Sequence, residues 1–443
     1  MKSKRSFKSL FWPTFIELIF FMLMGTVDTL MLSNYSDYAV GSVGNANTLI
    51  MMFAVLLLIV SNGVAVLVSQ YLGAKKEEVA HKMIGTGLII NFVVGFLLAS
   101  LLVFSADLLL KAVHTELVLF EDSKTYLSVI AMSLFFVAMS NVITASLRAY
   151  GFAKYITLIV IVANILNIIG NYVLIYGYLG FPSLGVYGAA LSTLGVRILM
   201  MITYFILLFT ILKVKMKDIK LNKESAKLIL KIGLPSAAES WTYTIMQAVI
   251  LGMVNSLGAD FTTARTYINT ILTYIYIFSV ATASANAVMT GYYIGERNYI
   301  KAYQQTFKNM VRNFFIIIFM TLVVNLSSQY ILRVFTTNTI IIETARKILW
   351  IAILLETGRS VNLILIQALR SAGDTTFPLI MALFSMIGVA IPVAYLLGIS
   401  LSLGLFGIYI AYACDELIRA GFMFFRWQSR KWEAKSYYLE KTA

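Results

Sequence analysis

The sequence predicts an all-α membrane protein with twelve transmembrane helices in two six-helix lobes, related by a pseudo-twofold axis along the membrane normal. Composition is the first observation behind this prediction. Hydrophobic residues make up 60% of the 443 residues and charged residues only 13%, whereas soluble domains carry about 25% charged residues. The second observation is that apolar runs of about 20 residues, long enough to cross a bilayer, recur throughout the chain. The third is that the two halves of the chain repeat one another.

Twelve apolar spans follow one another along the chain. They cover residues 10–32, 47–71, 84–108, 126–147, 155–178, 186–212, 232–254, 267–291, 309–332, 347–369, 376–398 and 403–425. The first span follows a basic start and resembles a secretory signal, but it contains Glu17, lacks an A-x-A-like cleavage site and has a second copy deep in the chain. We therefore expect it to be the first transmembrane helix.

The repeat appears when the chain is displaced along itself so that Pro13 falls on Pro235, a displacement that we call the repeat shift. Without any gap, it also matches Glu17 with Glu239, Asn47 with Asn269, Arg148 with Arg370, Gly151 with Gly373, and Arg197 with Arg419. Matches at glycine, proline and charged residues of corresponding helices and loops indicate that the chain arose by duplication. Because six spans is an even number, both copies insert with the same orientation. We expect an N-lobe at 1–212, a cytoplasmic linker at 213–231, a C-lobe at 232–425 and a basic cytoplasmic tail at 426–443, with a substrate path between the lobes.

The net charge of +14 is explained by membrane topology. If the N-terminus lies inside, the inner segments hold 26 of the 35 Lys and Arg residues and the outer segments hold six. This asymmetry is the positive-inside pattern, and it predicts a multi-pass protein of the cell (plasma) inner membrane with both termini in the cytoplasm. It favours anionic lipid at the inner face and requires no nucleic-acid partner.

The residue types that carry enzymatic chemistry are scarce. Cys414 is the only cysteine, and His81 and His114 are the only histidines, so the sequence contains neither an internal disulfide nor a Cys/His metal motif. Walker motifs and nucleophile elbows are also absent. We therefore expect a protein that is not an enzyme and has no cofactor.

One acid in the first repeat has no counterpart in the second. Asp28 lies in the outer part of the first span, where a carboxylate in lipid is a functional candidate by default. Asn167 and Asn171 in the fifth span and Thr193 in the sixth lie at a similar depth, because a helix rises about 1.5 Å per residue. Their oxygen atoms suit a proton-exchanging carboxyl or a small hard cation such as Na⁺. The alternative is a hydrogen-bonded structural acid with asparagines that join helices. The equivalent positions in the second repeat are Ile250, Val389, Val393 and Asp415.

Other polar residues within the spans allow two interpretations each. Glu17 and Glu239 would either attract cationic substrates or hold helix ends by hydrogen bonds. Pro13 is either simply tolerated because it lies near the start of a helix, or it lets the first helix bend. Charged residues three and four apart predict two structural ion pairs, Glu356 with Arg359 and Asp415 with Arg419. Arg197 has no obvious local partner.

Six segments resemble the MATE (multidrug and toxic compound extrusion) family in order and spacing over essentially the whole chain. They are GTVDTLML, LRAYGFAKY, ILNIIGNYVLIYG, GVYGAALST, KIGLPSAAES and LRSAGDTTFP. The resemblance implies two six-helix lobes around a central cavity and efflux driven by proton or sodium re-entry. It also implies a cation site in the N-lobe, at positions that correspond here to Asp28, Asn167, Asn171 and Thr193.

Two departures limit what the resemblance implies. One branch of the family has an aspartate where this chain has Asn171, which weakens the expectation of tight sodium binding. The NorM branch has a second ion site in the C-lobe, built from a glutamate and an aspartate. Asp374 matches that aspartate, but Tyr243 stands at the glutamate position, so we do not expect the second site. We expect Asp374 to cap the eleventh helix instead.

The function expected from these observations is antiport. A proton or Na⁺ would bind at Asp28, shift the first helix and expel an organic, cationic or lipophilic drug by alternating access, and we expect a monomer. The alternative in the same architecture is a flippase for a lipid-linked saccharide or another lipid, which would need a more cationic cavity. A receptor or scaffold is disfavoured because it would not require duplication.

Overall fold

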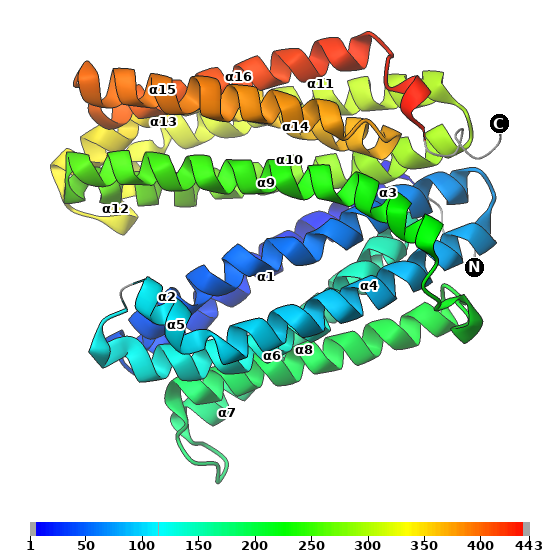
Figure 1. The fold of residues 1–443 in the computed structure, drawn as a ribbon. Helices are drawn as coiled ribbons and strands as arrows, with labels where there is room; N and C mark the ends of the chain where they lie inside the picture. Colours follow the sequence, from blue (N-terminus) through cyan, green and yellow to red (C-terminus); the bar gives the residue numbers. More distant parts are fainter. Residues whose placement is uncertain (1–5, 114, 437–443) are drawn as a thin grey trace. The chain divides into compact units, whose positions relative to one another are not determined.

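The computed structural model describes residues 6–113 and 115–436 of the chain, and within these ranges it is helical with no β-strand. Residues 1–5, His114 and the end of the expected tail, residues 437–443, lie outside the described ranges. The chain forms two compact units, residues 1–72 with 76–233 and residues 73–75 with 234–443. The all-α fold class is therefore confirmed, and each unit is described separately below (Figure 1).

The first unit contains the first six predicted spans. Its helices are α1 (Phe7–Ser33), α2 (Asp37–Ala54), α3 (Leu58–Gly73), α4 (Glu77–Phe104), α5 (Ala106–Ala112), α6 (Leu117–Ala149), α7 (Ala153–Tyr176) and α8 (Gly185–Thr210). A single 3-10 turn joins α2 to α3, so these two helices make one span. α6 packs against α2, α4 and α8, while α7 packs against both α1 and α8 (Figure 1).

The second unit repeats this arrangement. Its helices are α9 (Lys223–Leu257), whose first residues up to 233 belong to the first unit, α10 (Ala259–Gly295), α11 (Tyr299–Leu326), α12 (Ser328–Phe335), α13 (Thr339–Ala372), α14 (Thr376–Ala382), α15 (Ile391–Ala394) and α16 (Gly404–Gln428). Two π-helical segments, Leu383–Ala390 and Tyr395–Ser400, join α14 and α15 into one continuous helix. α13 packs against α10, α11 and α16, as its counterpart α6 packs against α2, α4 and α8. The expected linker at 213–231 is partly helical, because α9 already begins at Lys223.

Ten helices of the described chain are long and apolar enough to cross a membrane. The other two predicted spans correspond to α9 and α16, which are equally long but more polar. α16 carries Asp415, Glu416 and Arg419 in its middle, and all three are buried. All twelve predicted spans therefore coincide with helices, and the polar helix α16 buries its charged face inside the protein.

Local sequence signals explain several helix ends. Ser6 and Ser9 form a capping box at the start of α1, and Asn338 caps α13 through the N–H groups of Ile340 and Ile341. Gly151 and Gly373, which are matched across the repeat, have φ angles of 86° and 93°. Glycine enters this left-handed region without steric strain. The same helix end is thus built in both copies, and it explains why this glycine recurs.

Candidate functional site

The four residues of the predicted cation site lie together in the first unit. Asp28 is on α1, Asn167 and Asn171 are one turn apart on α7, and Thr193 is on α8. Because α7 packs against both α1 and α8, its two amides face partners on both neighbouring helices. Both asparagines are fully buried and Thr193 is buried, whereas Asp28 is half-buried.

A chain of hydrogen bonds connects these side chains. The Nδ2 of Asn171 donates to the Oδ1 of Asp28 at 2.6 Å and to the Oδ1 of Asn167 at 3.3 Å. The Nδ2 of Asn167 donates in turn to the hydroxyls of Ser192 and Thr193, both at 3.3 Å. The Oδ1 of Asn171 is buried and has no hydrogen-bond partner among the described residues. The site therefore keeps one buried acceptor next to a carboxylate.

Small residues allow α7 and α8 to approach closely at this site. A Cβ atom placed on Gly170 would lie 2.4 Å from the Oγ of Ser192. A Cβ atom on Gly188 would lie 2.5 Å from the carbonyl oxygen of Leu174. Neither position has room for a side chain, so these glycines bring the α7 amides within reach of the α8 hydroxyls.

α7 binds α1 through polar side chains along its whole length. Thr157 donates to the carbonyl oxygen of Pro13 at 2.7 Å and Asn164 to that of Phe20 at 2.9 Å. Tyr176 donates to the carbonyl oxygen of Met31 at 2.7 Å. Together with the bond from Asn171 to Asp28, these bonds form a series that we call the α1–α7 bond series. The sequence prediction missed Thr157 and Asn164, although both precede Asn171 at intervals of seven residues.

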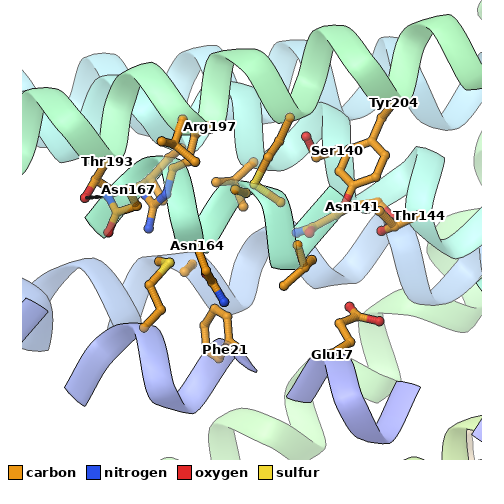
Figure 2. A pocket seen from close by; sticks show the side chains of 18 of the residues that line it. Glu17, Phe21, Ser140, Asn141, Thr144, Asn164, Asn167, Thr193, Arg197 and Tyr204 are labelled. Atoms are coloured by element: carbon orange, nitrogen blue, oxygen red, sulfur yellow. Dashed lines mark hydrogen bonds between the residues drawn. The ribbon is translucent and has the colours of Figure 1, made fainter. Parts of the chain in front are cut away.

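A cavity of about 400 Å³ borders the candidate cation site. Figure 2 shows Glu17, Asn164 and Arg197 around it, with Asn167 and Thr193 at one end. Its wall combines Phe21, several methionines, amide side chains and hydroxyl groups with three charged residues, Glu17, Arg148 and Arg197. Apolar surface with a few convergent polar groups is typical of small-molecule sites.

The matched acids Glu17 and Glu239 form matched ion pairs. Arg148 pairs with Glu17 in the first unit, and Arg370 pairs with Glu239 in the second at 2.7 Å. The repeat shift relates both the acids and the arginines. Each carboxylate is therefore neutralised by an arginine, and the role of these two acids stays a prediction. Pro13 lies inside the continuous helix α1, where its carbonyl oxygen accepts the bond from Thr157.

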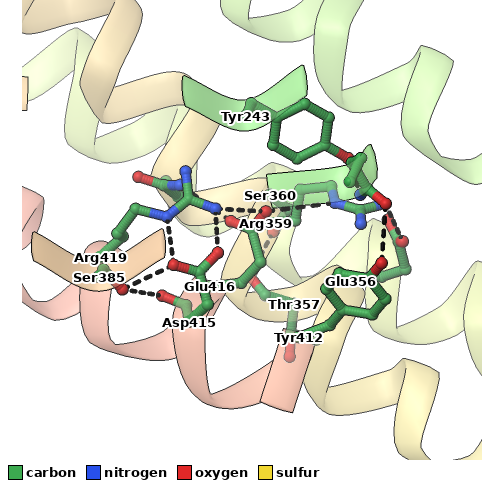
Figure 3. Close-up of polar contacts among 12 residues, drawn as sticks. Tyr243, Glu356, Thr357, Arg359, Ser360, Ser385, Tyr412, Asp415, Glu416 and Arg419 are labelled. Carbon is green, nitrogen blue, oxygen red and sulfur yellow. Dashed lines mark hydrogen bonds and ion pairs between the residues drawn. The ribbon is translucent and has the colours of Figure 1, made fainter. Parts of the chain in front are cut away.

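The second unit buries a cluster of charges between α13 and α16, which we call the α13–α16 cluster (Figure 3). The two predicted pairs are confirmed: Arg359 contacts Glu356 at 2.6 Å, and Arg419 contacts Asp415 at 2.6 Å. The prediction missed Glu416, whose Oε1 lies 2.8 Å from Arg419 and 3.5 Å from Arg359. Because Glu416 lies three residues before Arg419 on the same helix, the sequence already indicated that the two side chains could pair.

The expectation that Asp374 caps a helix is wrong. The residue before α14 is Thr375, and no side chain caps that helix. Asp374 is buried and accepts a hydrogen bond from the Nε of Arg426 at 2.7 Å. A charge-assisted bond of this kind is stronger than a bond to a neutral backbone N–H group. Tyr243, at the glutamate position of the NorM branch, accepts a hydrogen bond from Gln247 at 2.8 Å.

Metal-binding clusters of the usual residue types are not part of this arrangement. Within residues 6–113 and 115–436, no three His, Cys, Asp or Glu side chains gather in a way that could hold a metal ion. The candidate site on α1, α7 and α8 instead offers one carboxylate, two amides and one hydroxyl.

Known proteins resemble this chain over nearly its whole length. It is 36% identical over 430 residues to the "Uncharacterized transporter YisQ" of Bacillus subtilis, covering 96% of this chain and 94% of that protein. It is 26% identical over 435 residues to the "Probable multidrug resistance protein NorM" of Thermotoga maritima, covering 96% and 92%. Its fold matches the "Outward-facing conformation of a multidrug resistance MATE family transporter of the MOP superfamily" with a TM-score of 0.88 at 21% identity, covering 96% of this chain and 95% of that one.

The MatE family model matches the chain twice, over residues 13–173 and 235–396. The two matches begin at Pro13 and Pro235, the pair of prolines that defines the repeat shift. With these two matches, the YisQ relative and the shared fold, the chain belongs to the MATE family of membrane transporters.

Proposed function

We propose that this protein is a proton-coupled efflux transporter of organic, lipophilic compounds, with Asp28 as the proton-binding residue. The supporting observation is the half-buried carboxylate of Asp28, which accepts a single side-chain hydrogen bond, from Asn171, among the described residues. No ion pair neutralises Asp28 among the described residues, and an unpaired acid within a membrane helix is energetically costly in its ionised form. A proton that arrives from outside neutralises the carboxylate and removes this energetic cost.

The hydrogen bonds favour a proton over Na⁺ as the coupling ion. Na⁺ would need several oxygen ligands, but the Oδ1 of Asn167 already accepts from Asn171, and both amides use their N–H groups toward neighbours. Among the oxygens of Asp28 and the two amides, the Oδ2 of Asp28 and the Oδ1 of Asn171 accept no side-chain hydrogen bond from the described residues. Na⁺ is the second candidate, because that buried Oδ1 has no partner among the described residues.

Protonation of Asp28 would act through α1. The ionised carboxylate is a strong acceptor for Asn171, and the neutral acid is a weaker one. Protonation therefore weakens one member of the α1–α7 bond series and lets α1 shift relative to α7. Because α1 contributes Glu17, Phe21 and Met24 to the cavity wall, a shift of α1 changes the shape of the cavity. This is how proton entry would expel a bound substrate in an alternating-access cycle.

The membrane context of this proposal follows from charge and from the relatives. We propose that the chain lies in the cell (plasma) inner membrane as a monomer, with both termini in the cytoplasm, as the positive-inside pattern indicates. The relatives named NorM are described as probable multidrug resistance proteins, which supports drugs as substrates. A lipid flippase is the rival within the same architecture.

The test is transport in proteoliposomes loaded with fluorescent organic compounds: ethidium, dansylcadaverine and dansylglycine. Efflux is driven separately by a pH gradient and by a Na⁺ gradient. We expect efflux under the pH gradient alone and its loss in Asp28→Asn. Asp107→Asn is the matched control, because this exposed residue pairs with Lys124 on the protein surface.

Three outcomes would overturn parts of the proposal. If well-folded Asp28→Asn protein kept full pH-driven efflux, Asp28 would not be the coupling residue. Efflux under the Na⁺ gradient alone would mean that the coupling ion is Na⁺ and not a proton. Transport under neither gradient would favour the flippase.

A further inference from the structure

Arg197 is a cationic side chain that faces the cavity with most of its hydrogen-bonding capacity unused. It lies on α8, is half-buried and lines the cavity wall, and Figure 2 shows it pointing into that space. Its guanidinium donates to the hydroxyl of Ser133, its one hydrogen bond among the described residues. A guanidinium carries five N–H donors, so several of them remain available to a ligand in the cavity.

The second repeat contains the same arginine with its charge fully neutralised. Arg419 is the match of Arg197 under the repeat shift. It is buried and contacts both Asp415 and Glu416 at 2.6 and 2.8 Å. The first repeat has Thr193 and Leu194 at these two positions. The first repeat thus keeps the arginine, lacks both neighbouring acids and opens the side chain to a cavity.

Among the described residues, the other charged groups around the cavity form no ion pair with Arg197. Glu17 is bound by Arg148. Asp28 acts on Arg197 electrostatically, but its Oδ1 is held by Asn171, and no ion pair joins Asp28 to Arg197 among the described residues. The charged residues of the wall therefore sum to one positive charge, carried by Arg197. Burying such a charge without a partner is unfavourable, and a ligand anion would remove the cost.

We infer that Arg197 is a specificity-determining residue that binds the carboxylate of an amphiphilic substrate in this cavity. The inference deepens the proposed function and rests on it. The planar guanidinium matches a carboxylate with two parallel hydrogen bonds, which a lysine cannot reproduce. Phe21, Met24 and Met200 line the same cavity and suit an apolar or aromatic body. The preferred substrates are thus organic acids or zwitterions with an apolar body rather than simple cations.

The test measures equilibrium binding to purified protein in lipid nanodiscs, without any gradient. Dansylglycine carries a carboxylate, its methyl ester is neutral with the same fluorophore, and dansylcadaverine is a cation. We expect the native protein to bind dansylglycine about tenfold or more tightly than the ester, the range expected for hydrogen bonds to a charged group. Dansylcadaverine should bind more weakly than dansylglycine.

Three variants separate the role of the arginine from general damage. Arg197→Gln should reduce the ratio of acid to ester affinity to about one, and Arg197→Lys should give an intermediate ratio. Leu194→Glu keeps the arginine but supplies the acid that the second repeat has at position 416, and it should also abolish the preference. Arg333→Gln, at an exposed position of α12, is the matched control and should leave the ratio unchanged.

Equal binding of acid and ester to the native protein would overturn the inference. So would an unchanged ratio in both Arg197→Gln and Leu194→Glu. Since binding is measured without a gradient, failure here is distinguishable from failure of the proposed efflux, which the proteoliposome assay detects. A preserved acid preference without gradient-driven transport would support the role of Arg197 and contradict only the coupling.

Discussion

Removing one arginine from the α13–α16 cluster should destabilise the second unit strongly. With all five groups ionised, Glu356, Asp415 and Glu416 face Arg359 and Arg419, which leaves one negative charge in excess. Arg419→Met would raise this excess to two and leave Asp415 without its arginine in a buried site. Breaking a buried pair in this way costs about 3 to 5 kcal/mol. For a unit of this size that corresponds to a fall in melting temperature of roughly 6 to 20 °C.

The assay follows thermal unfolding of purified protein in detergent by tryptophan fluorescence and by size-exclusion recovery after heating. The triple variant Arg419→Met, Asp415→Asn, Glu416→Gln leaves only Glu356 paired with Arg359, and it should recover most of the loss. The reasoning is refuted if Arg419→Met melts within about 2 °C of the native protein, a shift of roughly 1 kcal/mol or less. It is also refuted if the triple variant is no more stable than the single one.

Two further predictions concern the first unit. Glu17→Gln leaves Arg148 without its carboxylate partner and should lower the free energy of unfolding by about 1 to 3 kcal/mol. The double variant Glu17→Arg, Arg148→Glu exchanges the two charges and should restore most of that stability in the same melting assay. If the single and the double variant lost equal stability, the ion pair would be contradicted. Gly188→Ala places a Cβ atom 2.5 Å from the carbonyl oxygen of Leu174 and should push α8 away from α7. We expect this displacement to reduce pH-driven efflux about tenfold. Gly25→Ala is the control, because its Cβ atom meets nothing within 4 Å, and it should leave efflux unchanged.

Much of the first unit could be predicted because the relevant signals are local. Depth along a helix follows from residue number, so Asp28, Asn167, Asn171 and Thr193 could be placed at one level from the sequence. The structure brings these four side chains together. Their role in binding an ion remains a prediction, because hydrogen-bond geometry alone does not identify the ion.

Contacts between distant helices were harder to predict. The partner of Glu17 is 131 residues away in the sequence, and it depends on how α1 and α6 are rotated about their axes. The repeat nevertheless contained the information, since Glu17 and Arg148 both have matched copies that also form a pair. The expectation for Asp374 is wrong for a different reason. Capping is a local interaction, but Arg426, 52 residues later in the sequence, is a charged partner that binds the carboxylate more strongly than backbone N–H groups would.

The α1–α7 bond series has a consequence for how differently the two helices tolerate substitution. Three of its four acceptors on α1 are backbone carbonyl groups, at Pro13, Phe20 and Met31, and every amino acid supplies such a group. The donors on α7 are specific side chains and cannot be exchanged in this way. A substitution of Phe20 or Met31 therefore leaves the acceptor on α1 in place, whereas a substitution of Thr157, Asn164 or Tyr176 removes a donor from α7.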